Sequence, residues 1–213
     1  MARILELHPD NPQPRLLAQA VDVLRGGGVI AFPTDSGYAF GCAVGDKTAI
    51  ERIRAIRGVD EKHLFTLMCR DLSEIATYAR VGNIEYRFLK QYTPGAYTFI
   101  LQATHEVPRR LQHPKRKTVG LRVPDHPLAQ ALLAAHGEPI LSNSLILAGE
   151  REPLTDAHEI DERAGRRLDL ILDVGFCADR PTTVIDMAGD VPVLVRRGRG
   201  EVPVGVEEAE EWT

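Results

Sequence analysis

The sequence is poor in the features that mark several classes of protein. It has three cysteines, Cys42, Cys69 and Cys177, which are widely spaced and form no CxxC pair. A disulfide framework and a thiolate zinc site are therefore not expected. No apolar run approaches the length of a membrane-spanning helix, and charges and prolines interrupt the first 30 residues, so we expect no signal peptide. These absences predict a cytoplasmic protein without membrane partners.

The chain also lacks internal repeats and any linker rich in serine, glycine or proline, and its 213 residues suit one domain. Hydrophobic residues make up 44% and charged residues 26%, which is typical of a globular protein and excludes a disordered or coiled-coil chain. We predict a single domain over residues 1–200 and an acidic, flexible tail over 201–213. That tail holds five glutamates and neither lysine nor arginine.

The formal net charge of −4 hides an uneven distribution. Residues 46–122 contain 15 basic and 8 acidic residues, a net charge of +7, whereas the remainder of the chain carries −11. The basic excess peaks in five residues that lie close together in sequence: Arg109, Arg110, Lys115, Arg116 and Lys117. Such a segment can attract phosphates, including those of RNA, or it can be a solvated loop.

Hydrophobic periodicity and turn residues predict a chain in which helices and strands alternate. We expect helices over 12–25, with Asn11 as the cap, then over 47–57, 83–91 and 126–136, with another starting at Asp71. We expect strands over 29–32, 38–43, 64–69, 97–102, 118–123, 169–174, 182–186 and 192–196. Because the alternation is not a strict βαβ repeat, a mixed sheet in an α/β or α+β fold is predicted.

One segment comes close to a phosphate-binding motif but does not match it. Residues 41–48 resemble a P-loop, but the spacing is one residue short and Asp46 would repel phosphate. We interpret Asp46 as the N-cap of the helix that follows. The seven histidines are scattered without the spacing of metal ligands, so no tightly bound protein metal is expected.

Six short polar segments stand beside predicted strands, and they are richer in hydroxyls and arginine than ordinary connectors. They are PTDSGYAFG (33–41), PGAYTFIL (94–101), TVGLRVPDHP (118–127), LSNS (141–144), PTTVID (181–186) and VRRG (195–198). Arg122 stands alone within an apolar strand. A buried guanidinium is costly unless it is paired, so Arg122 needs a carboxylate or phosphate partner.

In this order, the six segments resemble the YrdC-like family of L-threonylcarbamoyladenylate synthases, and FTLMCRDLSE and VPRRL resemble its YciO branch. The resemblance covers residues 10–200. It implies a single α/β domain with a twisted mixed sheet flanked by helices and a concave, positively charged face. It also implies the synthesis of threonylcarbamoyl-AMP and pyrophosphate from threonine, bicarbonate and ATP. That product supplies the threonylcarbamoyl group later attached to an adenosine of tRNA.

The resemblance also implies roles for individual residues. Threonine would be bound by Thr34, Arg122 and Thr182, with Arg122 holding the substrate carboxylate bidentately. The nucleotide would be bound by three hydroxyl residues and one guanidinium: Thr98, Ser142, Ser144 and Arg196. ATP is then a substrate, and Mg²⁺ accompanies it. The alternatives are turn or cap chemistry for the threonines, a structural ion pair for Arg122 and a solvated strand end for Arg196.

The sequence departs from the family pattern at two motifs. Active members carry Lys-x-Arg after the second helix, where this chain has Arg57-Gly58-Val59, and Ser-x-Asn later, where it has Ser142-Asn143-Ser144. We assign the catalytic cation to Arg57, with Lys62 or, as an alternative, Arg54 as a substitute for the missing charge. A one-residue slip in an extended segment usually reverses a side chain's face, so Asn143 is not expected to replace the displaced asparagine. Each lost donor costs on the order of 3 kcal/mol of transition-state stabilisation.

Two functions therefore stay open. The first is an enzyme that makes threonylcarbamoyl-AMP or adenylates a related small acid. The second is a non-catalytic module that binds nucleotide and double-stranded RNA or tRNA through the basic segment 109–117. The expected partners are ATP, threonine or a related acid, and RNA, and the expected state is a monomer or weak dimer. RNA binding of this kind weakens steeply with salt.

Overall fold

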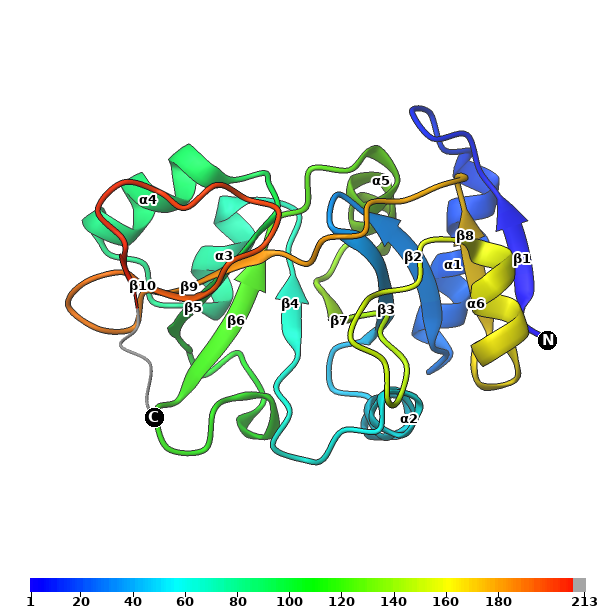
Figure 1. Cartoon of the computed structure of the whole chain (residues 1–213), viewed down its shortest axis with the longest axis horizontal. Coiled ribbons are helices and arrows are strands. Elements are labelled where there is room, and N and C mark those ends of the chain that lie inside the picture. Colours follow the sequence, from blue (N-terminus) through cyan, green and yellow to red (C-terminus); the bar gives the residue numbers. More distant parts are fainter. Residues whose placement is uncertain (209–213) are drawn as a thin grey trace.

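The computed structural model describes residues 1–208, whose strands form one twisted mixed sheet with helices packed against it (Figure 1). The strands are β1 (Arg3–Glu6), β2 (Ile30–Thr34), β3 (Gly37–Ala43), β4 (Thr66–Met68), β5 (Tyr97–Gln102), β6 (Thr118–Arg122), β7 (Ile140–Ser144), β8 (Leu170–Asp173), β9 (Thr183–Asp186), β10 (Val193–Arg196) and β11 (Glu207–Glu208). They pair in the order β1-β8-β2-β3-β7-β4-β6-β5-β9-β10-β11.

The helices of the described residues are short. They are α1 (Pro14–Arg25), α2 (Lys47–Arg57), α3 (Leu72–Tyr78), α4 (Asn83–Tyr92), α5 (Pro127–His136) and α6 (Ala157–Ala164), with two single 3-10 turns, η1 (Arg109–Leu111) and η2 (Gly165–Arg167). Among the helices of residues 1–208, none combines the length and apolar character that crossing a membrane requires.

Parallel and antiparallel pairs occur side by side in the sheet, which confirms the predicted mixed fold. β2 and β3 form an antiparallel hairpin, and β7 runs antiparallel to both β3 and β4. β4 and β6 are parallel, as are β5 and β9. Long-range pairing of this kind brings the polar segments after α2, β2, β6 and β7 to the middle strands of one sheet.

The apolar core lies on both faces of the sheet because strand residues alternate between them. Ile30 and Phe32 are fully buried in a cluster with α1 and α5, whereas Ala31 belongs to the cluster on the α2 side. In α1 the buried residues recur at helical spacing, at Leu17, Val21 and Leu24. That face packs on α5 and the sheet, as the sequence pattern predicted.

The observed N-caps agree with the predicted starts of two helices and differ from the predicted start of a third. The Asp46 carboxylate accepts a hydrogen bond from the Ala49 N–H at 2.9 Å, which confirms Asp46 as the cap of α2. Asp71 caps α3 in the same way through the Glu74 N–H, also at 2.9 Å. The first helix begins at Pro14 rather than Pro12, so the prediction of Asn11 as its cap was wrong.

Part of the predicted tail contacts the rest of the chain. Glu207 and Glu208 form β11, which pairs in parallel with β10, and Arg197 forms an ion pair with Glu208. The Tyr97 hydroxyl donates to the carbonyl of Glu201 at 2.9 Å. The prediction from sequence did not include these contacts of residues 201–208, and residues 209–213 lie outside the described part of the chain.

Candidate functional site

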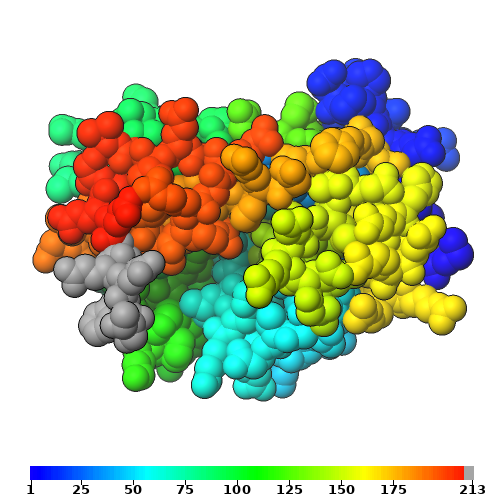
Figure 2. All heavy atoms as spheres, viewed as in Figure 1, coloured from blue at the N-terminus to red at the C-terminus, as the bar shows by residue number. Residues whose placement is uncertain are grey.

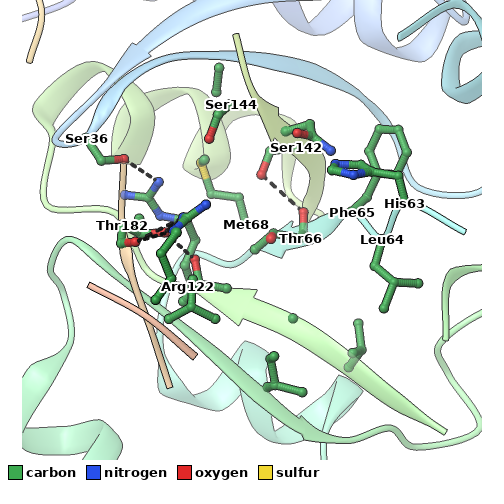
Figure 3. Close-up of a pocket in the computed structure, with 18 of the residues that line it drawn as sticks. Ser36, His63, Leu64, Phe65, Thr66, Met68, Arg122, Ser142, Ser144 and Thr182 are labelled. Atoms are coloured by element: carbon green, nitrogen blue, oxygen red, sulfur yellow. Dashed lines mark hydrogen bonds between the residues drawn. The ribbon is translucent and has the colours of Figure 1, made fainter. Parts of the chain in front are cut away.

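A cavity of about 270 Å³ lies over the middle strands of the sheet (Figure 3). Residues two apart along a strand share its lining, such as Thr98 with Ile100 and Gly120 with Arg122, because successive side chains of a strand point to opposite faces. Figure 2 shows the hollow near the centre of the view, where segments coloured cyan, green and orange meet. The sheet thus gathers residues from most of the chain into one site.

The lining has an unusual charge composition. It holds eight serine and threonine residues, two histidines and four arginines, namely Arg57, Arg116, Arg122 and Arg196. Within residues 1–208, no aspartate or glutamate lines it. Two carboxylates, Asp35 and Asp186, each contact one of these arginines from outside the lining. The cavity therefore presents positive charge and hydroxyl groups to whatever enters it.

Arg57 and Arg196 have only neutral partners among the described residues. Arg57 ends α2, and its Nη1 donates to the Asn143 side-chain oxygen and, at 2.7 Å, to the Ser144 carbonyl. Arg196 ends β10 and donates three hydrogen bonds of 3.0–3.2 Å, all to Thr182. Two guanidiniums that share a cavity and have no carboxylate partner have the charge and geometry suited to binding an anion.

The electrostatics of this pair reflect its setting. Burial, and then the nearby charge of Arg196, lower the pKa of Arg57 to about 10, so Arg57 remains protonated at neutral pH. Partial burial also lowers the pKa of Arg196, which is more exposed at the edge of the cavity. A bound anion would relieve both effects, because it offsets the lost hydration and the mutual repulsion.

Arg122 has the carboxylate partner that its burial was predicted to require. It is 6% exposed, forms an ion pair with Asp35 and donates to the Ser36 hydroxyl at 2.8 Å. The guanidinium is thus paired within the chain, as the structural ion-pair alternative predicts, and its binding of a substrate carboxylate stays a prediction. Its Nε is buried without a hydrogen-bond partner among the described residues, as is Asp35 Oδ2.

The predicted hydroxyl residues lie at the cavity, but most of their hydroxyls are used locally. Thr34 donates to the Gly37 carbonyl at 2.7 Å and accepts from the Ser36 N–H, which is turn chemistry. Thr98 and Thr182 share a buried hydrogen bond of 2.8 Å. Ser142 donates to the Thr66 carbonyl at 3.1 Å (Figure 3). These groups shape the wall of the cavity and fix its polar atoms.

Of two further predicted site residues, one lies at the cavity and the other does not. Ser144 lines the cavity beside Ser142, as predicted from the LSNS segment. Lys62 is exposed on the loop between α2 and β4 and is absent from the lining, so the geometry does not support it as a substitute cation. Its backbone N–H donates to Asp60 at 2.9 Å, which keeps it within a turn of that loop.

The basic segment 109–117 borders the cavity on one side. Arg116 lines the cavity and pairs with Asp186, and His113 lies beside it in the lining. Arg110 donates to the Gly45 carbonyl and Lys117 to the Pro114 carbonyl. Two further basic residues, Arg109 and Lys115, are exposed. The five predicted RNA-binding residues are thus not equivalent, since only Arg116 lines the cavity.

Sequence reasoning missed Asn143, His63 and His113 as cavity residues. Asn143 is paired within β7, opposite Phe40 of β3, and its side chain meets Arg57 at the end of α2. One end of the cavity is formed by His63 together with Leu64 and Phe65 (Figure 3). Burial, and then the charge of Arg57, lower the pKa of His63, so its ring is neutral at pH 7. The signal available in the sequence was the LSNS segment itself, which contains Asn143.

Within residues 1–208, no group of three or more histidine, cysteine or carboxylate side chains is arranged to hold a metal ion. All three cysteines are buried and unpaired by disulfides. Burial raises the pKa of Cys42 to about 12, which makes it a poor nucleophile.

The family model for Sua5, YciO and YrdC proteins, described as "Telomere recombination", matches residues 22–198. The uncharacterized protein YciO of Escherichia coli K12 is 55% identical over 202 residues, covering 95% of this chain and 98% of that protein. The crystal structure of E. coli YciO superposes with a TM-score of 0.93 at 54% identity, covering 97% of this chain and all of the other.

More distant relatives carry a stated activity or ligand. A threonylcarbamoyl-AMP synthase of Bacillus subtilis is 30% identical over 194 residues, which is 91% of this chain and 55% of the synthase. The crystal structure of P. abyssi Sua5 complexed with L-threonine has a TM-score of 0.86 at 25% identity, covering 97% of this chain and 62% of the other. The chain belongs to the Sua5/YciO/YrdC family.

Proposed function

We propose that the chain binds ATP in the arginine-lined cavity and joins it to a carbamate of threonine or a related small amino acid, as an L-threonylcarbamoyladenylate synthase. The observation that carries this proposal is the pair Arg57 and Arg196, two guanidiniums that share a cavity and have no carboxylate partner among the described residues. Such a pair suits the phosphates of a nucleotide. The related synthases and the threonine complex of P. abyssi Sua5 support the choice of substrate class.

The proposed reaction needs positioning and charge rather than a covalent intermediate. A carbamate oxygen attacks the α-phosphorus of ATP, a P–O bond to the β-phosphate breaks, and pyrophosphate leaves with the electron pair. Negative charge moves toward the pyrophosphate, so cations fixed in advance around it lower the barrier. Arg57 and Arg196 would serve this part, and Mg²⁺ would arrive with the nucleotide, since no carboxylate among the described residues lines the cavity.

The amino acid would occupy the end of the cavity formed by Thr34, Ser36 and Arg122. Arg122 uses one N–H of Nη1 for Ser36 and one of Nη2 for Asp35, and the remaining N–H on each of these nitrogens would donate to a substrate carboxylate. Thr98, Ser142 and Ser144 would form the wall along the nucleotide. The product then carries the threonylcarbamoyl group that modifies tRNA adenosine.

The test is pyrophosphate release from ATP at neutral pH, with threonine and bicarbonate both present or each omitted. We expect release that requires all three substrates and falls by about two orders of magnitude in Arg57→Met, the loss typical of removing one fixed donor at a developing charge. Arg52→Met is the matched control, because Arg52 is on the same helix, pairs with Asp169 and does not line the cavity. No release above background at high protein concentration would contradict the proposal.

The second candidate, RNA binding without catalysis, is favoured by one observation: the exposed basic segment continues into the cavity through His113 and Arg116. RNA lying on this segment could place a phosphate or a terminal nucleotide at the cavity. The affinity for double-stranded RNA should fall steeply as salt rises, and neutralising Arg109 and Lys115 should reduce the salt slope. A flat salt response, or unchanged affinity in that double variant, would remove this candidate.

A further inference from the structure

We infer that Asn143 is a positioning residue for Arg57: its amide oxygen fixes the guanidinium at the cavity while leaving the positive charge free for a phosphate. This inference rests on the proposed nucleotide site and assigns a role that the family's Ser-x-Asn pattern would not give to this position. It starts from the contact between the Arg57 Nη1 and the Asn143 side-chain oxygen.

Two acceptors on successive residues hold the same guanidinium nitrogen. Arg57 Nη1 donates to the Asn143 side chain and, at 2.7 Å, to the Ser144 carbonyl, both at the end of β7. Because a guanidinium is planar, fixing one nitrogen at two points also fixes the direction of the others. Arg57 Nε is buried and has no hydrogen-bond partner among the described residues.

The backbone supports this placement of Arg57. Gly58 follows in the left-handed region at φ 67°, and a Cβ there would lie 2.8 Å from the Ala148 side chain. The chain can therefore leave α2 sharply, close against the segment after β7, while the Arg57 side chain reaches the end of β7. A residue other than glycine would strain this turn and push the two segments apart.

The neutral character of the partner is the central point. Arg122 and Arg116, in the same cavity, are each matched by an aspartate, which cancels their charge. An amide oxygen gives direction without charge, so Arg57 keeps its attraction for anions. An aspartate at position 143 could also accept the hydrogen bond from Arg57. Its negative charge would offset that of the guanidinium, so anion binding should be weaker with aspartate than with asparagine.

This arrangement also explains how two departures from the family pattern occur together. The chain has arginine where the pattern has lysine, and asparagine one position before the pattern's asparagine. The longer arginine reaches the displaced asparagine, so the two changes form one contact. We therefore expect Arg57 and Asn143 to act as a unit in binding.

The experiment is calorimetric titration with pyrophosphate and with ATP, using wild type, Asn143→Asp, Asn143→Ala, Arg57→Met and the Arg57→Met/Asn143→Ala double variant. We expect Asn143→Asp to weaken pyrophosphate binding about 10- to 100-fold, the effect of losing one charge-assisted contact. Asn143→Ala should weaken it less, and should have no further effect once Arg57 is removed. Asn11→Asp, an exposed asparagine away from the cavity, controls for the added charge and should bind as wild type does.

Thermal melting of the same variants separates positioning from folding. Asn143→Asp can still accept the Arg57 bond, so it should melt no lower than Asn143→Ala while binding pyrophosphate more weakly. A merely structural role predicts the same order for stability and binding. Wild-type affinity in Asn143→Asp, or an equal loss from Asn143→Ala with and without Arg57, would overturn the inference.

The two proposals fail in different ways. If wild type binds pyrophosphate as described but releases none from ATP, threonine and bicarbonate, the synthase proposal fails and the role of Asn143 stands. If wild type binds neither pyrophosphate nor ATP, both proposals are wrong.

Discussion

Replacing Arg196 with glutamine removes one of the two guanidiniums that lack a carboxylate partner, and it should weaken ATP binding without unfolding the protein. Arg196 donates all three of its hydrogen bonds to Thr182, two to the carbonyl and one to the hydroxyl oxygen. That hydroxyl also shares a hydrogen bond with Thr98. Glutamine can keep part of this contact while losing the charge. The change therefore isolates the charge from the packing.

The magnitude follows from the exposure of Arg196. A unit charge about 4 Å from a phosphate charge contributes about 1 kcal/mol in water and about 4 kcal/mol at an effective dielectric constant of 20. Since Arg196 lies partly in solvent, screening favours the lower part of this range, about 1–2 kcal/mol. At 1.4 kcal/mol per tenfold, ATP should bind about 5- to 30-fold more weakly.

Calorimetry with ATP at neutral pH measures this effect, and Arg197→Gln is the matched control. Arg197 is the next residue, is 64% exposed in its side chain, and pairs with Glu208 away from the cavity lining. It should bind ATP as wild type does. Equal losses in both variants would show that only the overall charge matters, and no loss in Arg196→Gln would refute the assignment of Arg196 to the anion site.

Three further predictions concern stability. Arg122→Met leaves the Asp35 carboxylate buried without its cation and should destabilise the fold by about 3–5 kcal/mol in urea unfolding; adding Asp35→Asn should recover part of this loss, and additive losses would contradict the ion-pair account. His136 is buried without ring partners and burial lowers its pKa, so the unfolded chain binds more protons and stability falls as pH drops below about 6.5. His136→Leu should therefore narrow the difference in melting temperature between about pH 7.5 and about pH 5.5, and an unchanged difference would be inconsistent with this cause. Asp46→Ala removes the cap of α2 and should cost about 1 kcal/mol in the same unfolding assay, whereas the exposed Asp10→Ala should cost little; equal effects would argue against the cap.

Much of the fold could be predicted because its elements have local signals. The strand over 97–102 coincides with β5, and the helix over 47–57 coincides with α2, whose cap is encoded by Asp46. β1 and α6 were missed, since four and eight residues carry too little periodicity to stand out from a loop. β11 was missed because two glutamates have no strand signal of their own, and pairing with β10 decides their conformation.

The sequence predicted which residues line the candidate site better than it predicted their contacts. The family resemblance assigned four residues to one substrate site, and the structure places all of them in one cavity: Thr34, Thr98, Ser142 and Arg196. Which arginine is neutralised depends on long-range neighbours: Asp35 is 87 positions from Arg122 in the sequence, and no local pattern links the two.

The contact between Arg57 and Asn143 could not be predicted from strand register. Register gives the face of β7 that a side chain takes, but not which residue of α2 packs against that face. Long-range contacts of this kind decide how charge is distributed inside the site, and they arise from the assembled sheet rather than from any single segment.

A crystal structure with a non-hydrolysable ATP analogue would show whether an anion binds between Arg57 and Arg196. We expect a phosphate group in contact with both guanidiniums, inside the cavity over the middle strands. An analogue bound only at the exposed Arg109 and Lys115, with Arg57 and Arg196 free of phosphate, would contradict it.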